Sequence, residues 1–212
     1  MKAIRIERTG GPEVLELVQV EVPSPKAGEI LVRHEAVGVN FIDTYHRTGL
    51  YPVKLPSGLG LEAAGVVEAV GDGVERFKAG DRVAYASGPI GAYSELHVTS
   101  AARAVKVPEG VDVKVAAAAL LKGMTAEFLV RRTFPVKPGD TILVHAAAGG
   151  VGSILVQWAK HLGARVIGTA GSEAKAELAR GHGADHVILY RDQDVAAEVR
   201  RLVLDSPFSL VV

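Results

Sequence analysis

The chain has 212 residues, 48% of them hydrophobic, and its 24 basic side chains balance its 24 acidic ones. This neutral balance gives no reason to expect nucleic acid or an anionic membrane surface as a partner. Cysteine is absent, which excludes disulfides, thiolate nucleophiles and cysteine-bound zinc. No apolar run is as long as a membrane span, and the opening residues MKAIRIERTG have no signal-peptide core, so we expect a cytoplasmic protein.

The first half of the chain is predicted to form strands and turns. Short segments rich in valine, leucine and isoleucine alternate with turns such as Gly10-Gly11-Pro12 and Gly71-Asp72-Gly73. Several short strands at this spacing are typical of a β-barrel or a β-sandwich. The predicted strands cover residues 2–7, 14–22, 29–38, 63–70, 81–85 and 92–98.

From about residue 111 the pattern changes. Two helices are predicted, at 115–121 and 125–132, and the passage closes at Pro135 and Pro138. Strands that alternate with helices of about ten residues then indicate a parallel sheet with right-handed crossovers. The predicted strands are 141–145, 165–169, 186–190 and 208–212, and the predicted helices are 151–162, 172–180 and 194–204.

The segment HAAAGGVGS, residues 145–153, lies between the first of these strands and the helix that follows it. A helix N-terminus offers backbone N–H groups and a favourable dipole to a phosphate, and glycine allows a close approach. Compared with G-x-G-x-x-G, residues 147–152 keep the second and third glycines, while Ala147 replaces the first. Glycine pairs also occur in ordinary strand–helix turns, but the strand before and the helix after favour a dinucleotide pyrophosphate site.

The end of the next strand indicates which dinucleotide binds. An NAD site usually has an acidic residue about 20 positions on, which accepts a hydrogen bond from the ribose 2′-OH. Here the strand is followed by Ala170-Gly171-Ser172, with no acid at its tip. Glu173 comes next and can complement the helix dipole. Lys175 alone could be an ordinary solvated lysine, but together with the missing acid it favours a 2′-phosphate and therefore NADPH.

Five stretches of the chain resemble one known family. They are GVNFIDTYHRTGLYP (38–52), LPSGLGLEAAGVVEAVGDGVERFKAGDRVAYA (55–86), GAYSELH (91–97), LLKGMTAEFLVRRTF (120–134) and HAAAGGVGSILVQWAKHLGARVIGTAGS (145–172). They are similar to NADPH:quinone oxidoreductases, the zinc-free, ζ-crystallin-like branch of the medium-chain dehydrogenase/reductase superfamily. The resemblance covers essentially the whole chain and is far more specific than the glycine loop alone.

The resemblance implies an α/β fold in which a GroES-like β-barrel domain (1–121) precedes a Rossmann NADPH-binding domain (122–212). It implies that NADPH transfers hydride to a quinone or a related enone. Asn40, Asp43, Tyr45 and Thr125 are then expected near the nicotinamide and the substrate. The implied cofactor-binding residues are Gly149, Gly150, Val151 and Gly152 for the pyrophosphate, and Gly171, Ser172, Lys175 and Tyr190 for the 2′-phosphate. Two simpler readings stay open, with Tyr45 as a packing residue and Asp43 as a turn cap.

The zinc-dependent relatives provide an internal comparison. They carry a cysteine ligand near the position of Asn40 and a His-Glu pair after a glycine, whereas here Gly60 is followed by Leu61-Glu62. The seven histidines show no recurrent ligand spacing, so we expect no metal. Without a Lewis acid, alcohol dehydrogenation is disfavoured, while a quinone or enone delocalises the incoming charge itself.

A full dinucleotide fold has six parallel strands, and only four are predicted here. We therefore expect a Rossmann sheet truncated after its fourth strand, and weak or absent catalysis by these 212 residues alone. The full-length family implies a homodimer whose interface strand would be missing from this chain. Two alternative functions remain open: a non-catalytic, crystallin-like NADPH-binding protein, and an enoyl-thioester reductase of the same superfamily.

Overall fold

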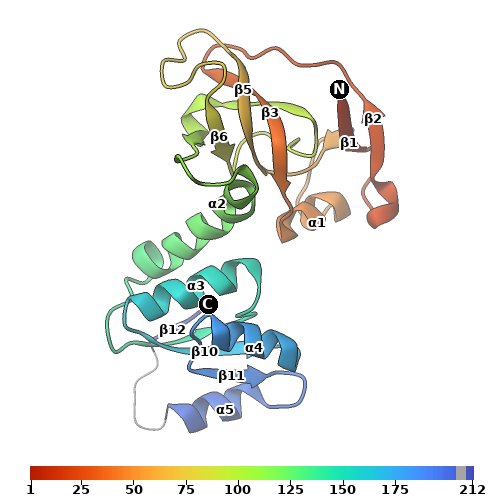
Figure 1. Cartoon of the computed structure of the whole chain (residues 1–212). Helices are drawn as coiled ribbons and strands as arrows, with labels where there is room; N and C mark the ends of the chain where they lie inside the picture. The colour runs from red at the N-terminus through yellow and green to blue at the C-terminus, as the bar shows by residue number, and fades with distance from the viewer. Residues whose placement is uncertain (204–208) are drawn as a thin grey trace. The chain divides into compact units, whose positions relative to one another are not determined.

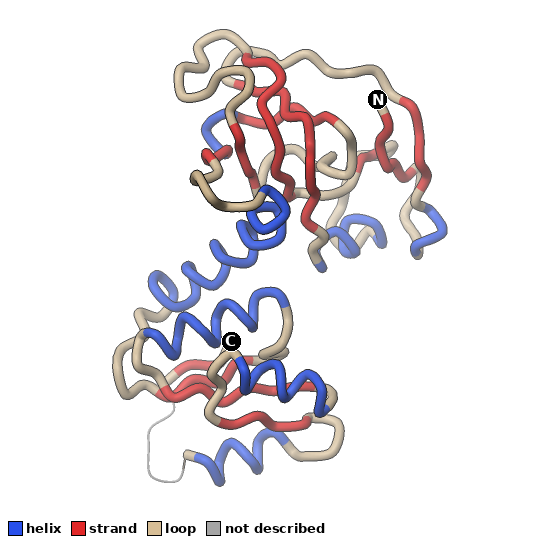
Figure 2. The backbone as a smooth tube through the Cα atoms, viewed as in Figure 1, coloured by secondary structure: helices blue, strands red, loops and turns tan. Residues whose placement is uncertain are grey.

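In the computed structural model, residues 1–203 and 209–212 are described. The chain divides into two compact units, Met1–Leu121 and Lys122–Val212. Strands dominate the first unit, and helices alternate with strands in the second (Figures 1 and 2). Within the described residues, no helix is long and apolar enough to cross a membrane.

The first unit contains two antiparallel sheets. The larger one has the strand order β7-β3-β5-β6-β8, and the smaller one has the order β2-β1-β4. A bridge between Ala3 and Ser94 connects β1 to the segment before β7. The strands are β1 (Lys2–Ile6), β2 (Glu16–Gln19), β3 (Glu29–Gly38), β4 (Ser57–Gly58), β5 (Glu62–Val70), β6 (Arg82–Tyr85), β7 (Leu96–Ser100) and β8 (Ala104–Lys106). The predicted strand at 14–22 is shorter than expected, because a 3-10 turn occupies Pro12–Val14.

A buried polar cluster lies within the larger sheet. The ring of His34, on β3, has Nδ1 2.7 Å from the carbonyl oxygen of Ser94 and Nε2 2.9 Å from the hydroxyl of Tyr85. Burial lowers the pKa of His34 to about 4, because the charged ring would lose its hydration. The neutral ring therefore serves as a structural hydrogen-bonding group that links β3 to Tyr85 on β6 and to the segment before β7.

Helix α1 (Phe41–Thr48) follows β3 directly, in a region for which only strands and turns were predicted. Asn40 is its N-cap, and Gly49 ends it with a left-handed φ of 82°, a conformation that glycine adopts without penalty. The pattern Asn40-x-x-Asp43 followed by Gly49 is a helix start and stop signal. The predicted all-β reading of this half was wrong here because that local signal was read as a turn.

Helix α2 (Val113–Glu127) is continuous, whereas two separate helices were predicted at 115–121 and 125–132. Gly123 does not interrupt it, since an alanine-rich helix tolerates one glycine at a modest cost. A π-helical turn, Phe128–Thr133, extends the helix. Backbone preceding a proline is biased away from helix, and the helical segment accordingly ends before Pro135.

The second unit contains a parallel sheet of order β11-β10-β9-β12. Helices α3 and α4 contribute to one apolar cluster with the sheet, and α5 contributes to another with Leu143, Ile167 and Ile188. The elements are β9 (Thr141–Val144), α3 (Gly150–His161), β10 (Arg165–Ala170), α4 (Glu173–Gly181), β11 (His186–Leu189), α5 (Val195–Leu202) and β12 (Leu210–Val211). The predicted helix 194–204 and strand 208–212 reach residues 204 and 208, which lie outside the described residues.

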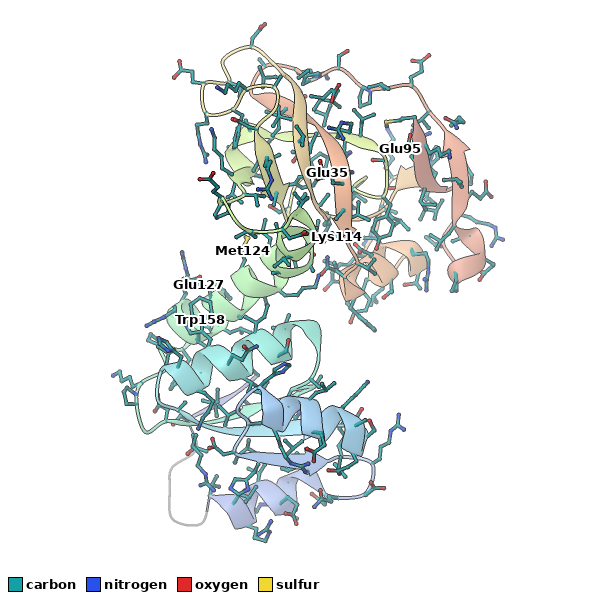
Figure 3. The ribbon with its side chains drawn as sticks, viewed as in Figure 1. Glu35, Glu95, Lys114, Met124, Glu127 and Trp158 are labelled. Atoms are coloured by element: carbon teal, nitrogen blue, oxygen red, sulfur yellow. The ribbon has the colours of Figure 1, made fainter. Side chains whose placement is uncertain are left out.

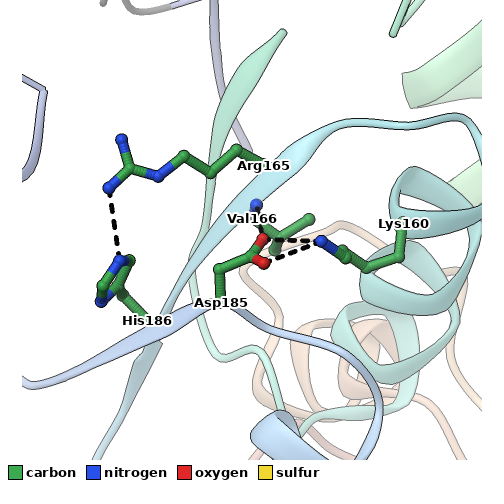
Figure 4. Close-up of polar contacts among 5 residues, drawn as sticks. All are labelled: Lys160, Arg165, Val166, Asp185 and His186. Atoms are coloured by element: carbon green, nitrogen blue, oxygen red, sulfur yellow. Dashed lines mark hydrogen bonds and ion pairs between the residues drawn. The ribbon is translucent and has the colours of Figure 1, made fainter. Parts of the chain in front are cut away.

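At their amino-terminal ends, β10 and β11 are joined by polar contacts (Figure 4). Both carboxylate oxygens of Asp185 accept from Lys160 Nζ, at 2.8 and 2.9 Å, and Oδ2 also accepts from the Val166 N–H at 2.7 Å. Trp158 projects from α3 (Figure 3). It is partly buried and packs against the apolar cluster that α3 forms with the sheet. These contacts anchor α3 to the sheet at the end opposite the glycine loop.

Candidate functional site

The glycine loop connects the carboxyl end of β9 to the N-terminus of α3. Gly149 is the N-cap and Gly150 is the first helical residue. The first N–H groups of a helix have no partners within the helix, so they point outward with the positive end of the helix dipole. In the strand order β11-β10-β9-β12, β10 and β11 are added on one side of β9, and β12 is added on the other side. The strand order therefore switches between β9 and β12. Open α/β sheets bind ligands at the carboxyl edge beside such a point.

Close packing explains the glycines of this loop. A Cβ on Gly152 would collide with the carbonyl oxygen of Ala146, and a Cβ on Gly149 would lie 3.0 Å from the same oxygen. Ala147, which replaces the first motif glycine, is fully buried, and a Cβ on Gly168 would lie 2.8 Å from its methyl group. The missing first glycine is therefore compensated by Gly168 on the neighbouring strand.

A pocket of about 100 Å³ opens beside the loop, and its lining includes Gly149, Thr169, Gly171, Lys175 and Tyr190. A Cβ on Gly171 would collide with the Tyr190 hydroxyl, so glycine allows that ring to lie against the backbone. Among the described residues that line this pocket, none has an acidic side chain. The pocket thus offers a lysine and a phenol to an anion.

Glu173 and Ser172 follow the pocket at the start of α4. Glu173 pairs with Arg180 at 2.7 Å, and its pKa is lowered chiefly by that hydrogen bond. Its carboxylate therefore has a partner on its own helix. Ser172 is the N-cap by backbone geometry, but its side chain makes no capping hydrogen bond.

Lys122 also borders the loop, although the sequence analysis did not single it out. Its side-chain carbons lie 3.3 to 3.5 Å from the position that a Cβ on Gly150 would take. The lysine stem therefore passes directly over the first residue of α3. The local sequence, LLKGMT, does not predict that Lys122 lies close to the glycine loop, which comes later in the chain.

Asn40 of the first unit is held by a buried carboxylate. Its Nδ2 donates to Glu62 Oε2 at 2.8 Å, and the other oxygen, Oε1, accepts from the Leu121 N–H at 2.8 Å. Glu62 is fully buried, and a Cβ on Gly38 would collide with its carboxylate. These contacts fix the Asn40 amide at the junction of β3 and α1. Among the described residues, no group of three or more His, Cys, Asp or Glu has an arrangement that could hold a metal ion.

Asp43 caps the start of α1. Its Oδ2 accepts from the Asn40 N–H at 2.9 Å and from the Tyr93 hydroxyl at 2.7 Å. Asp43 is only 4% exposed. Burial first, and then the hydrogen bond and charge of Asp43, raise the pKa of Tyr93. Asp43 and Asn40 thus form one hydrogen-bonded network, in which Asp43 caps the helix α1 and not the turn that was considered for it.

Tyr45 lies on α1 among other aromatic rings. Its ring centroid is 5.3 Å from that of Phe41, edge to face, and 5.3 Å from that of Tyr51. Phe41 is 73% exposed and Tyr51 is 47% exposed. Thr125 is half-buried on α2 and belongs to the second unit, whereas Asn40, Asp43 and Tyr45 belong to the first.

Comparison with known proteins identifies two family models and several relatives that match this chain. Residues 26–109 match the family model of the alcohol dehydrogenase GroES-like domain, and residues 150–212 match that of the zinc-binding dehydrogenases. Quinone oxidoreductase of Pseudomonas aeruginosa is 55% identical over 202 residues, which cover 95% of this chain and 62% of that protein.

Two solved structures are also similar to this chain in sequence and in fold. One is Escherichia coli quinone oxidoreductase complexed with NADPH, at a TM-score of 0.94 and 49% identity, covering 95% of this chain and 62% of that one. The other is the quinone oxidoreductase from Coxiella burnetii, at a TM-score of 0.92 and 32% identity, covering 100% of this chain and 68% of that one.

A GroES-like β domain followed by a parallel nucleotide-binding sheet defines the medium-chain dehydrogenase/reductase superfamily. The chain belongs to the quinone oxidoreductase family of that superfamily. The predicted fold class and the predicted family are therefore confirmed. The chain spans 62% of the length of the Pseudomonas aeruginosa relative.

Proposed function

We propose that the chain acts in the NADPH-dependent reduction of quinones and related enones, and that the unit Lys122–Val212 binds the NADPH. The observation that carries this proposal is the pocket beside the glycine loop, where Lys175 and Tyr190 line the wall and no acid does. A carboxylate there would repel a 2′-phosphate and accept from a free 2′-OH. The NADPH of the Escherichia coli relative supports the same cofactor.

The residues of the second unit fit such a cofactor. The start of α3, from Gly150 through Val151 to Gly152, would receive the pyrophosphate, since the first backbone N–H groups of a helix have no partners within the helix. Lys175 and Tyr190 would bind the 2′-phosphate beside Gly171 and Ser172. Thr125 would contact the nicotinamide half. When bound, NADPH supplies the hydride, and the protein aligns donor and acceptor.

The residues of the first unit would act on the acceptor. Glu62 holds the Asn40 amide in one orientation, so Asn40 would present a fixed polar group to a substrate carbonyl. The Tyr45 hydroxyl would serve as a hydrogen-bond donor, while Asp43 keeps the helix start in place. The exposed ring of Phe41 next to Tyr45 suits a flat, conjugated acceptor. We further propose a homodimer, as the family resemblance implies, and a cytoplasmic location.

A titration with NADPH and with NADH tests the cofactor assignment. Trp158 lies on the helix that begins at the glycine loop, and it is the one tryptophan of the chain, so its emission reports binding by energy transfer to the nicotinamide. We expect NADPH to bind more tightly. Lys175→Ala should weaken NADPH about tenfold or more, since an exposed charge-assisted contact contributes about 1.5 kcal/mol, and should leave NADH unchanged.

Lys137→Ala is the matched control. Lys137 is also exposed and in the same unit, but it precedes β9 and so lies at the opposite edge of the sheet from the loop. The control variant should bind NADPH like the wild type. Equal affinity of the wild type for both nucleotides would refute the 2′-phosphate assignment, and absence of binding to either would refute the proposed cofactor site.

A further inference from the structure

Ala146 has an unusual backbone conformation at the centre of the loop. Its φ is +49°, and it is the one residue other than glycine with positive φ within the described ranges. Residues with a Cβ adopt this left-handed region at a free-energy cost, so surrounding contacts must impose it. The Ala146 carbonyl oxygen accepts from the Gly149 N–H at 2.7 Å and lies against Gly152. The direction of this one peptide unit therefore sets where α3 begins.

Thr169 supplies the contacts that impose this conformation. It is the penultimate residue of β10, next to the loop, and is 2% exposed. Its Oγ1 accepts from the Ala146 N–H at 3.2 Å and lies 3.3 Å from His145 Nδ1. Its backbone carbonyl accepts from the Ala147 N–H at 3.0 Å. One residue thus binds three successive residues of the loop.

We propose that the Thr169 hydroxyl is a positioning group for the cofactor, which holds the glycine loop in its binding conformation. This inference rests on the proposed function and goes further, since it assigns the loop's shape to a side chain on the neighbouring strand. A valine at 169 has the same shape but no acceptor for the Ala146 N–H. The loop would then exchange its left-handed turn for conformations that Ala146 prefers, and the free N–H groups of α3 would no longer converge.

The experiment compares NADPH dissociation constants, by Trp158 energy transfer, for the wild type and for Thr169→Val, Thr169→Ser and Thr169→Val combined with Ala146→Gly. We expect Thr169→Val to weaken NADPH binding about tenfold and Thr169→Ser to stay within twofold. Glycine adopts positive φ freely, so Ala146→Gly should restore most of the affinity that Thr169→Val loses. A purely structural role would not give this specific rescue.

Thr99→Val is the matched control, because Thr99 is a fully buried threonine in the first unit and its hydroxyl has no hydrogen-bond partner among the described residues. It should bind NADPH like the wild type. Wild-type affinity in Thr169→Val, or an equal loss with and without Ala146→Gly, overturns the inference while leaving the proposed function intact. If Thr169→Val does not fold, loss of affinity in Thr169→Ser overturns it instead. A wild type that binds no NADPH overturns both proposals.

Discussion

Replacing Glu62 with glutamine should destabilise the first unit strongly. Both carboxylate oxygens accept hydrogen bonds, from Asn40 Nδ2 and from the Leu121 N–H. A glutamine keeps one acceptor oxygen and must turn its NH₂ group toward the other donor. The change therefore removes one bond to a charged acceptor, worth about 1.5–3 kcal/mol, and leaves a buried donor without a partner at about 1–3 kcal/mol. Since the two costs overlap, we expect Glu62→Gln to lower the free energy of unfolding by about 2–4 kcal/mol.

Urea denaturation followed by the near-UV signal of the tyrosines measures this loss. Four of the five tyrosines lie in the first unit, and Tyr190 and Trp158 lie in the second. Most of the tyrosine signal therefore follows the first unit, and tryptophan emission follows the second unit separately. In thermal unfolding the same loss corresponds to a fall in Tm of roughly 6–15 °C for a unit of this size.

Glu68→Gln is the matched control for this prediction. Glu68 is on the same strand, and its pair with Arg33 is about half exposed on both sides, so its loss should cost less than about 0.5 kcal/mol. Adding Asn40→Asp to Glu62→Gln should recover most of the stability, because the new amide can donate to the new carboxylate. Equal stability of Glu62→Gln and Glu68→Gln, or no recovery in the double variant, would refute the reasoning.

Two further changes test the polar contacts of each unit. Tyr93→Phe removes the 2.7 Å hydrogen bond to the Asp43 carboxylate and should lower the free energy of unfolding by about 1.5–3 kcal/mol, as measured by urea denaturation. Burial alone would raise the pKa of Asp185, but the hydrogen bonds from Lys160 and Val166 outweigh it and lower the pKa. A lowered pKa stabilises the fold above the unfolded-state value near 4 and ceases to do so as pH falls through the folded-state value. The stability difference between wild type and Asp185→Asn should therefore shrink below about pH 4, and a pH-independent difference would contradict this.

The sequence predicted the second unit well because its signals are local. The strand–glycine–helix order around Gly149 and the alternation of later strands and helices are set by residues close in the chain. Helix α1 was missed although Asn40, Asp43 and Gly49 are local signals too, because the surrounding strand pattern was given more weight. The continuous α2 was missed as well, because two helices separated by residues 122–124 were predicted in its place.

The contacts that complete the candidate site join residues distant in sequence, and no local pattern predicts them. Asn40 meets Glu62 across 22 positions, and Asp43 meets Tyr93 across 50. Thr169 reaches Ala146 from the next strand of the sheet. Each depends on strand register, which is set by packing of the whole unit. Composition and motifs can therefore identify the glycine loop, but they cannot identify the side chains that hold it.

The role of Glu62 is explained by its tertiary contacts and not by its neighbours in the sequence. In the sequence it is the remaining member of a His-Glu pair that zinc-dependent relatives carry, and nothing nearby gives it a role. In the fold, its two oxygens accept from the amide of Asn40 and the backbone of α2. A buried carboxylate is costly unless hydrogen bonds satisfy it, and here those bonds fix both Asn40 and the helix that leads to Lys122. The residue is thus explained by the network it organises, and its removal should disturb Asn40 and α2 together.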